Sequence, residues 1–255
     1  MRPNTAYEDA LLLFVRGVLG RSTGNPLWTE LRSRATELAW FGALNSFTMA
    51  LLKFTSPGVP DIYQGNEVID LSLVDPDNRR PVDYAARSQL LDGLQPLVDA
   101  PRNVEVLARL SQLAAQPTDG HLKLWTTWRL LELRKKDPAL FQDGDYVPLR
   151  VHGSARDHVV AYARRTPTSL LIVVATRLYA RLLGHPGVPA VGAACWGDTA
   201  IDLAPLLQRP LQLHDVLSGA SHTVNLPRSA SEGQLRLADV LTELPGAALY
   251  SGPAG

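Results

Sequence analysis

The chain has 255 residues, and its 25 lysines and arginines balance its 25 aspartates and glutamates. This length is enough to bury a large core, while the balanced charge excludes a basic nucleic-acid-binding surface. No apolar run is long enough to span a bilayer, so neither nucleic acid nor membrane is an expected partner. The single cysteine, Cys195, excludes an internal disulfide, and together with the absence of an apolar leader it favours a cytoplasmic location.

The first fifty residues predict two helices. A capping-box pattern begins at Thr5, and apolar residues then recur at helical spacing as far as Gly20. A second, longer helix carries Leu31 to Leu51 and runs toward Lys53. Pro57 and Gly58 end this helix.

A short strand is expected next. Val59, Ile62 and Tyr63 form an apolar run bounded by Pro57 and Gly65, which is typical of a buried parallel strand. Polar residues that follow such a strand lie where a barrel enzyme binds its substrate. Three helices are predicted after this polar stretch: one capped by Asp83, one over residues 104–113, and one carrying Leu124, Trp128 and Leu131.

The pattern changes near residue 145, where short segments rich in valine, isoleucine and tyrosine begin. They predict antiparallel strands over residues 146–151, 158–165, 169–177, 200–203, 211–217, 222–226 and 247–251. Residues 175–197 are expected to form a loop rich in glycine and proline. We therefore expect two units, a mostly helical one over residues 1–145 and an antiparallel β domain over residues 146–255.

Residues 56–83 carry a recognisable motif. They read Gly58-x-Pro60-x-x-Tyr63-x-Gly65-x-Glu67, followed by Asp75-Pro76-Asp77-Asn78-Arg79-Arg80-Pro81-Val82-Asp83. The stretch resembles the last barrel strand of the α-amylase superfamily of glycoside hydrolases, and its second half is similar to the maltooligosyltrehalose synthase family. The resemblance implies an α/β plus all-β fold. Such a fold is the C-terminal part of a (β/α)8 TIM barrel, with its helices and last strand, followed by an antiparallel β-sandwich domain.

The resemblance also implies a reaction. Enzymes of this family convert the reducing-end α-1,4 linkage of a maltooligosaccharide into an α,α-1,1 linkage by intramolecular transglucosylation, as a (1→4)-α-D-glucan 1-α-D-glucosylmutase. Their catalytic acids precede a Pro-Asn-x-x-Tyr-Glu helix, which here occupies Pro3 to Glu8. No catalytic residue is therefore expected in this chain. It is expected to be inactive alone and to need the N-terminal barrel portion as its partner. A fragment, an incorrectly assigned start and one half of a split enzyme stay open as explanations.

Three residues are predicted to contact substrate. In the superfamily, the aspartate and arginine of the Asp-Pro-x-Asn-Arg loop hold a glucose unit, which assigns that role to Asp75 and Arg79. Glu67, just after the predicted strand, is the third candidate. Taken alone, the turn-forming residues around Asp75 also fit a solvated turn with no function. His152 and His158 have no metal-ligand spacing, so neither a metal nor a cofactor is expected.

Two other functions stay open at this stage. The first alternative is a portion of an α-glucan hydrolase of the same superfamily. A non-catalytic carbohydrate-binding module is the alternative from a different class.

Overall fold

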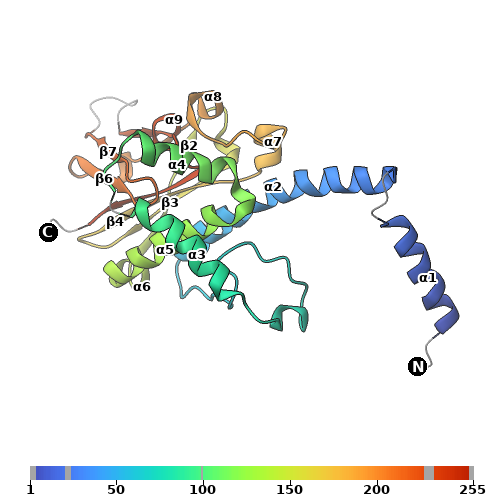
Figure 1. Cartoon of the computed structure of the whole chain (residues 1–255). Coiled ribbons are helices and arrows are strands. Elements are labelled where there is room, and N and C mark those ends of the chain that lie inside the picture. The colour runs from blue at the N-terminus through green and yellow to red at the C-terminus, as the bar shows by residue number, and fades with distance from the viewer. Residues whose placement is uncertain (1–3, 21–23, 99, 227–232, 253–255) are drawn as a thin grey trace.

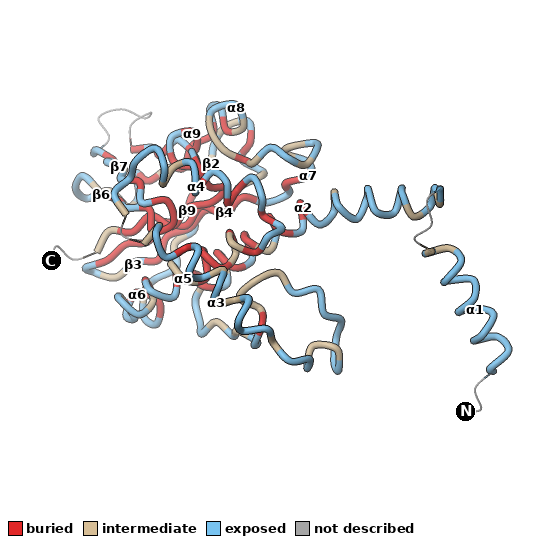
Figure 2. Tube along the Cα trace, viewed as in Figure 1, coloured by how far each residue is buried: buried red, intermediate tan, exposed pale blue. Residues whose placement is uncertain are grey.

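The computed structural model describes residues 4–20, 24–98, 100–226 and 233–252. A compact body of sheets and helices holds most of these residues, and one long helical arm projects from it (Figure 1). The arm consists of α1 (Thr5–Val18) and the first half of α2 (Pro26–Thr55). The second half of α2 runs into the body, so this one helix joins two different environments (Figure 2).

The helices begin where side chains can cap them. Asn4 accepts a hydrogen bond from the Tyr7 amide, so the cap of α1 is one residue earlier than the predicted capping box. Asp83 caps α3 as predicted, accepting from the Ala86 amide at 2.9 Å. The remaining helices are α3 (Tyr84–Leu94), α4 (Val104–Ala115), α5 (His121–Lys136), α6 (Pro138–Gln142), α7 (Tyr179–Leu183), α8 (Gly192–Trp196) and α9 (Leu237–Val240).

Within the described residues the strands form two sheets, and every pairing of strands is antiparallel, as predicted for this region. One sheet has six strands in the order β1-β3-β4-β9-β6-β7, and the other has three in the order β2-β5-β8. The strands are β1 (Asp145–Pro148), β2 (Val151–His152), β3 (Val159–Arg165), β4 (Leu170–Thr176), β5 (Ala200–Asp202), β6 (Leu211–Asp215), β7 (Ser221–Val224), β8 (Gln234–Arg236) and β9 (Gly246–Ser251). Within the expected loop over residues 175–197, two short helices, α7 and α8, are present.

The core is continuous across residue 145. Every residue of β4 is buried, and the second half of α2 packs against β4 and β9. Gly246 of β9 allows this close approach, since a β-carbon there would lie 2.9 Å from the Phe47 ring and 3.0 Å from Leu51. The Thr48 hydroxyl of α2 also donates to the Thr176 carbonyl of β4 at 2.7 Å. Helices and sheet therefore share one packed interior.

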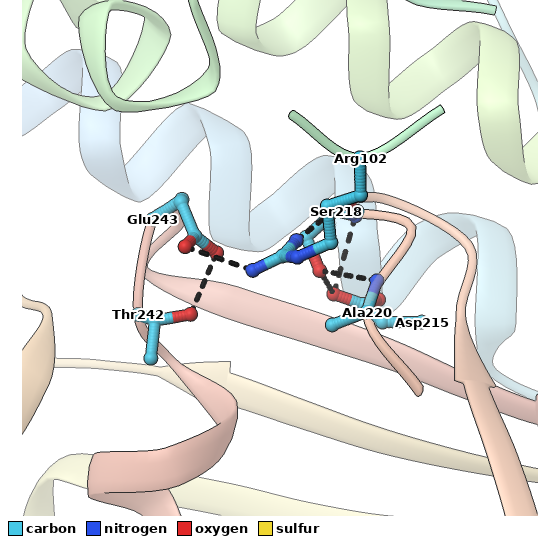
Figure 3. A network of polar contacts seen from close by, with 6 residues as sticks. All are labelled: Arg102, Asp215, Ser218, Ala220, Thr242 and Glu243. Carbon is cyan, nitrogen blue, oxygen red and sulfur yellow. Dashed lines mark hydrogen bonds and ion pairs between the residues drawn. The ribbon is translucent and has the colours of Figure 1, made fainter. Parts of the chain in front are cut away.

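A polar network ties the segment before α4 to the β region (Figure 3). The Arg102 guanidinium donates to the Ser218 carbonyl at 2.8 Å and to the Glu243 carboxylate at 2.9 Å. The Thr242 hydroxyl donates to the same carboxylate. Behind them, the buried Asp215 carboxylate accepts from the amide and the hydroxyl of Ser218. The network fixes the turn after β6 against the helices.

The predicted strand at residues 59–63 is wrong. This segment has no regular secondary structure, and Val59 is 93% exposed. A parallel strand is stable only when neighbouring strands satisfy its backbone groups, and the described residues offer none beside this segment.

No helix among the described residues combines the length and the apolar character needed to cross a membrane.

Candidate functional site

The candidate site is the long loop between α2 and α3, residues 56–83, which extends from one side of the body (Figure 1). Its first part, residues 58–68, runs along α3 and α5 and is here called the stem. Its outer part, residues 70–80, is here called the tip, and it contains a 3₁₀ turn over Asp77–Arg79. Stem and tip are held by different sets of contacts.

Three cationic side chains from the body hold the stem: Arg134, Lys123 and Arg87. Arg134 of α5 donates to the carbonyls of Phe54 at 2.9 Å and Gly58 at 3.3 Å. Lys123 of α5 donates to the Val68 carbonyl at 2.9 Å. Since no described strand pairs with the stem, Arg134 and Lys123 satisfy the Gly58 and Val68 carbonyls in place of a strand neighbour, and Arg134 also joins the stem to the end of α2.

Arg87 of α3 makes the densest contact with the stem. Its guanidinium donates to the Gly65 carbonyl at 2.7 Å and lies 3.4 Å from the Glu67 carboxylate. Gly65 has a φ of +89°, and a β-carbon there would lie 3.3 Å from the Arg87 guanidinium. Glycine is therefore required at this turn both for its backbone conformation and for the approach of Arg87.

The tip is held by its own side chains. Asp75 and Arg79 form a two-pronged ion pair, in which one guanidinium nitrogen lies 2.6 Å from the carboxylate. Asp77 accepts from the Leu73 amide at 2.8 Å and pairs with Arg80. No hydrogen bond among the described residues joins residues 71–80 to the body. The tip is therefore a self-contained turn carried by the stem.

The structure brings two of the three predicted site residues together. Asp75 and Arg79 face each other on the tip, and both side chains are more than half exposed, so their outer hydrogen-bonding positions remain open to a ligand. Glu67 lies in the stem, half-buried, with its carboxylate engaged by Arg87. Only the tip pair presents an exposed carboxylate beside an exposed guanidinium on this loop.

Local electrostatics distinguish tip from stem. Hydrogen bonds from the Ser72 hydroxyl and amide lower the pKa of Asp70, which keeps this tip carboxylate ionised. Burial lowers the pKa of Lys123, and nearby Lys53 lowers it further, while Asp70 and Glu67 oppose the shift. The Lys123 ammonium of α5 is thus partly desolvated where it donates to the Val68 carbonyl.

Sequence reasoning missed Arg87 and Lys123. One signal for Lys123 was available, because it lies in the first turn of α5, where a positive charge opposes the helix dipole. Arg87 follows its helix cap Asp83 by four residues, and its third contact is with the Asp83 carbonyl at 3.0 Å. Nothing local indicates that its guanidinium also reaches residues 65–67.

The described residues contain no cluster of three or more histidine, cysteine or acidic side chains that could hold a metal ion. The Asp75–Arg79 pair has the chemistry to bind a ligand with vicinal hydroxyls. Its carboxylate accepts hydrogen bonds from such hydroxyls, and its planar guanidinium donates two.

Comparison with known proteins extends this picture. No protein-family model matches the chain. It is 37% identical over 180 residues to a putative maltooligosyl trehalose synthase of Mycobacterium tuberculosis strain CDC 1551 / Oshkosh, and equally to that of strain H37Rv. The match covers 71% of this chain and 19% of each relative, so the chain spans about a fifth of the length of these curated relatives.

Solved structures match over almost the whole chain. The maltooligosyltrehalose synthase of Arthrobacter ramosus has a TM-score of 0.68 at 30% identity, covering 98% of this chain and 27% of the enzyme. A variant of that enzyme gives a TM-score of 0.70 at 31% identity with the same coverage. In fold and sequence, this chain is therefore similar to one portion of a much longer enzyme. The enzymes concerned are maltooligosyltrehalose synthases, and the chain resembles their C-terminal portion, as residues 56–83 predict.

Proposed function

We propose that the chain is the C-terminal portion of an enzyme that converts the reducing-end α-1,4 linkage of maltooligosaccharides into an α,α-1,1 linkage. The observation that carries this proposal is the match of 98% of the chain to the Arthrobacter ramosus synthase at 30% identity. The Asp75–Arg79 pair, exposed on the loop that carries the family motif, supports it independently.

In this proposal, residues 1–145 complete a (β/α)8 barrel and residues 146–255 form a β-sandwich domain attached to it. The segment 59–63 becomes a barrel strand only when neighbouring strands are supplied by the N-terminal barrel portion. The isolated segment has open backbone groups and exposed apolar side chains, which is what a strand without its neighbours would show.

The helical arm supplies the surface for that missing portion. No residue of α1 is buried, although the helix is rich in large apolar residues. A helix that is apolar on most of its sides is normally covered by other parts of a protein. The exposed apolar residues of the arm are Tyr7, Leu11, Leu12, Leu13, Phe14, Val15, Leu19, Leu27, Leu31 and Leu38.

Asp75 and Arg79 bind a glucose unit in this proposal. A paired carboxylate and guanidinium can engage two vicinal hydroxyls in fixed directions, which holds a sugar ring in register. Glu67 is the third sugar contact in this proposal. Its carboxylate would bind the sugar and Arg87 at the same time.

Catalytic carboxylates come from the N-terminal barrel portion. Retaining glycoside chemistry needs a nucleophilic carboxylate and a protonated acid about 5 Å apart. A glucosyl ester forms on the nucleophile as the terminal glycosidic bond breaks, and the acid protonates the leaving oxygen. The released glucose then attacks the ester's anomeric carbon through its own anomeric hydroxyl, which breaks the bond to the nucleophilic carboxylate, closes the α,α-1,1 bond and returns a proton to the acid. The site must exclude water, which would give hydrolysis instead.

The test uses the assembled enzyme, meaning this chain joined to or combined with its N-terminal barrel portion. We expect it to consume the reducing ends of maltohexaose with little release of glucose. Asp75→Asn should weaken substrate binding, raising KM by about tenfold or more, while Asp92→Asn, an exposed acid on α3, should not.

Release of glucose or maltose in place of reducing-end loss would assign the chain to an α-glucan hydrolase instead. Saturable maltooligosaccharide binding by this chain alone, without turnover in any assembly, would make it a binding module.

A further inference from the structure

We propose that Arg87 and Lys123 are positioning residues that set where the Asp75–Arg79 pair meets the substrate. This inference rests on the proposed function and deepens it. Neither side chain contacts the tip pair; each acts by fixing the stem that carries the tip.

Arg87 fixes the point where the chain turns away from the body. All three of its guanidinium nitrogens are engaged: Nε with Glu67 at 3.4 Å, one terminal nitrogen with the Asp83 carbonyl at 3.0 Å and the other with the Gly65 carbonyl at 2.7 Å. Asp83 is the last residue of the loop, and Gly65 lies within the stem. One planar group therefore sets the separation between the stem and the end of the loop at α3.

Lys123 fixes the last residue of the stem before the tip begins. Its ammonium donates to the Val68 carbonyl at 2.9 Å. The side chain of Val68 is seated at the same place, because a β-carbon at Gly120 would lie only 3.2 Å from the Val68 β-carbon. Lys123 and Gly120 thus hold both the backbone and the side chain of one stem residue.

The tip transmits this position without deforming. Asp77 holds the Leu73 amide and Asp75 holds Arg79, so the internal geometry of the tip does not depend on Arg87 or Lys123. Loss of a stem contact should therefore displace the tip as a unit. Displacement of a correctly formed binding pair by about an ångström weakens productive binding without abolishing it.

Arg87 and Lys123 also share an electrostatic partner in the stem, Glu67. Glu67 pairs with Arg87 and lies close enough to Lys123 to favour its charged form. The stem thus contains one half-buried carboxylate between two cations from different helices. This arrangement ties α3 and α5 to the same segment of loop.

The experiment measures KM and kcat of the assembled enzyme on maltohexaose for Lys123→Met and Arg87→Met. We expect KM to rise about tenfold and kcat to change less than about twofold. Lys123→Arg, which can still donate to Val68, should restore most of the affinity. Lys135→Met, an exposed lysine on the same helix, is the matched control and should leave both constants unchanged.

A double-mutant cycle separates positioning from general stabilisation. If Lys123 acts through the tip pair, Lys123→Met should have little further effect on KM in an Asp75→Asn background. Additive effects of the two substitutions on KM would overturn the inference. A fall in kcat and in melting temperature with no change in KM would overturn it too.

Hydrogen exchange on the same assembled variants gives a readout that does not depend on turnover. In Lys123→Met, the amides of Leu73 and Arg79 should keep their protection, because their partners lie inside the tip. The Asn66 amide donates to the Tyr63 carbonyl within the stem, and it should lose protection because the stem is no longer fixed at Val68. Unchanged protection of Asn66 would contradict the positioning role even if the enzyme performed a different reaction. Failure of the wild-type enzyme to convert maltohexaose would instead contradict the proposed function.

Discussion

The two halves of α2 experience opposite environments. Leu44 in its second half is completely buried in the core, whereas Leu38, less than two turns earlier, is 70% exposed. The sequence also changes along the helix, because the first half carries Glu30, Arg32, Arg34 and Glu37, whereas the second half carries one charged residue, Lys53. The polar half nevertheless leaves large apolar side chains such as Leu31 and Leu38 exposed.

The same contrast holds for the molecule as a whole (Figure 2). The six-stranded sheet and the helices on it form a buried apolar core, which contains β4 and most of β9. The arm and the loop tip leave apolar residues in solvent, among them Leu71 and Val74, which are 87% and 86% exposed. Soluble proteins rarely expose large apolar patches, and this exposure is the basis for the proposal that the arm and the loop contact the N-terminal barrel portion.

The largest expected effect concerns self-association of the isolated chain. Leu13→Glu combined with Phe14→Glu places two charges on the exposed face of α1 and removes roughly 4 kcal/mol of apolar burial from any contact made through it. We expect the association constant, measured by sedimentation equilibrium, to fall about a thousandfold. Arg16→Glu on the same helix is the control. Equal association constants for the unchanged chain, the double variant and Arg16→Glu would show that self-association does not occur through the arm.

Paired truncations in α2 test the core directly. Leu44→Ala should lower the free energy of unfolding by about 2–5 kcal/mol, since it opens a cavity in a fully packed site. Leu38→Ala should change it by less than about 0.5 kcal/mol in the isolated chain. Urea titration in dilute protein measures both values. A similar loss for the two variants would mean that the arm is already packed against something.

A buried arginine provides the next largest effect. Arg164 of β3 is 1% exposed and donates to the carbonyls of Thr55, Phe141 and Gly144. Arg164→Met removes these donors and should cost about 3 kcal/mol by urea titration, because buried acceptors are left unpaired. The adjacent Arg165, paired with Asp145 at the surface, is the matched control, and Arg165→Met should cost less than about 1 kcal/mol. The reverse ranking would contradict the packing described for β3.

The smallest effect is a pair of opposite titrations. Burial raises the pKa of Asp215, so the unfolding free energy should fall as pH rises from the unfolded value of 3.8 through the folded one. Hydrogen bonds from Ser72 lower the pKa of Asp70, so its contribution is present above 3.8 and is lost as pH falls through the folded value. Carboxyl carbon NMR of the isolated chain should place the Asp215 midpoint above 3.8 and the Asp70 midpoint below it. The opposite order would contradict the burial of Asp215.

The parts of the fold predicted from sequence are those that local pattern determines. The helices over α3, α4 and α5 and the strands β3 and β4 follow from periodicity and caps. The short helices α7 and α8 were missed, because Tyr179 and Trp196 are fixed there by burial in the core and not by a repeating pattern. The three-residue strand β8 is defined only by its pairing with β5.

The candidate site divides in the same way. Asp75 and Arg79 lie four residues apart in a recognisable motif, so their proximity was predictable. Arg87 and Lys123 reach residues 20 and 55 positions away, and such contacts depend on how α3 and α5 pack. The strand at residues 59–63 failed because an apolar run forms a strand only beside strands that pair with it, and the described residues place none there.

The most direct test of the central claim is the size and activity of the native protein that carries the loop. An antibody raised against residues 71–83 should capture from extracts of the source cell a polypeptide or complex several times larger than the 27.8 kDa of this chain. The captured material should consume the reducing ends of maltohexaose without releasing glucose. Capture of a free, monomeric 27.8 kDa chain with no associated protein and no such activity would contradict the account.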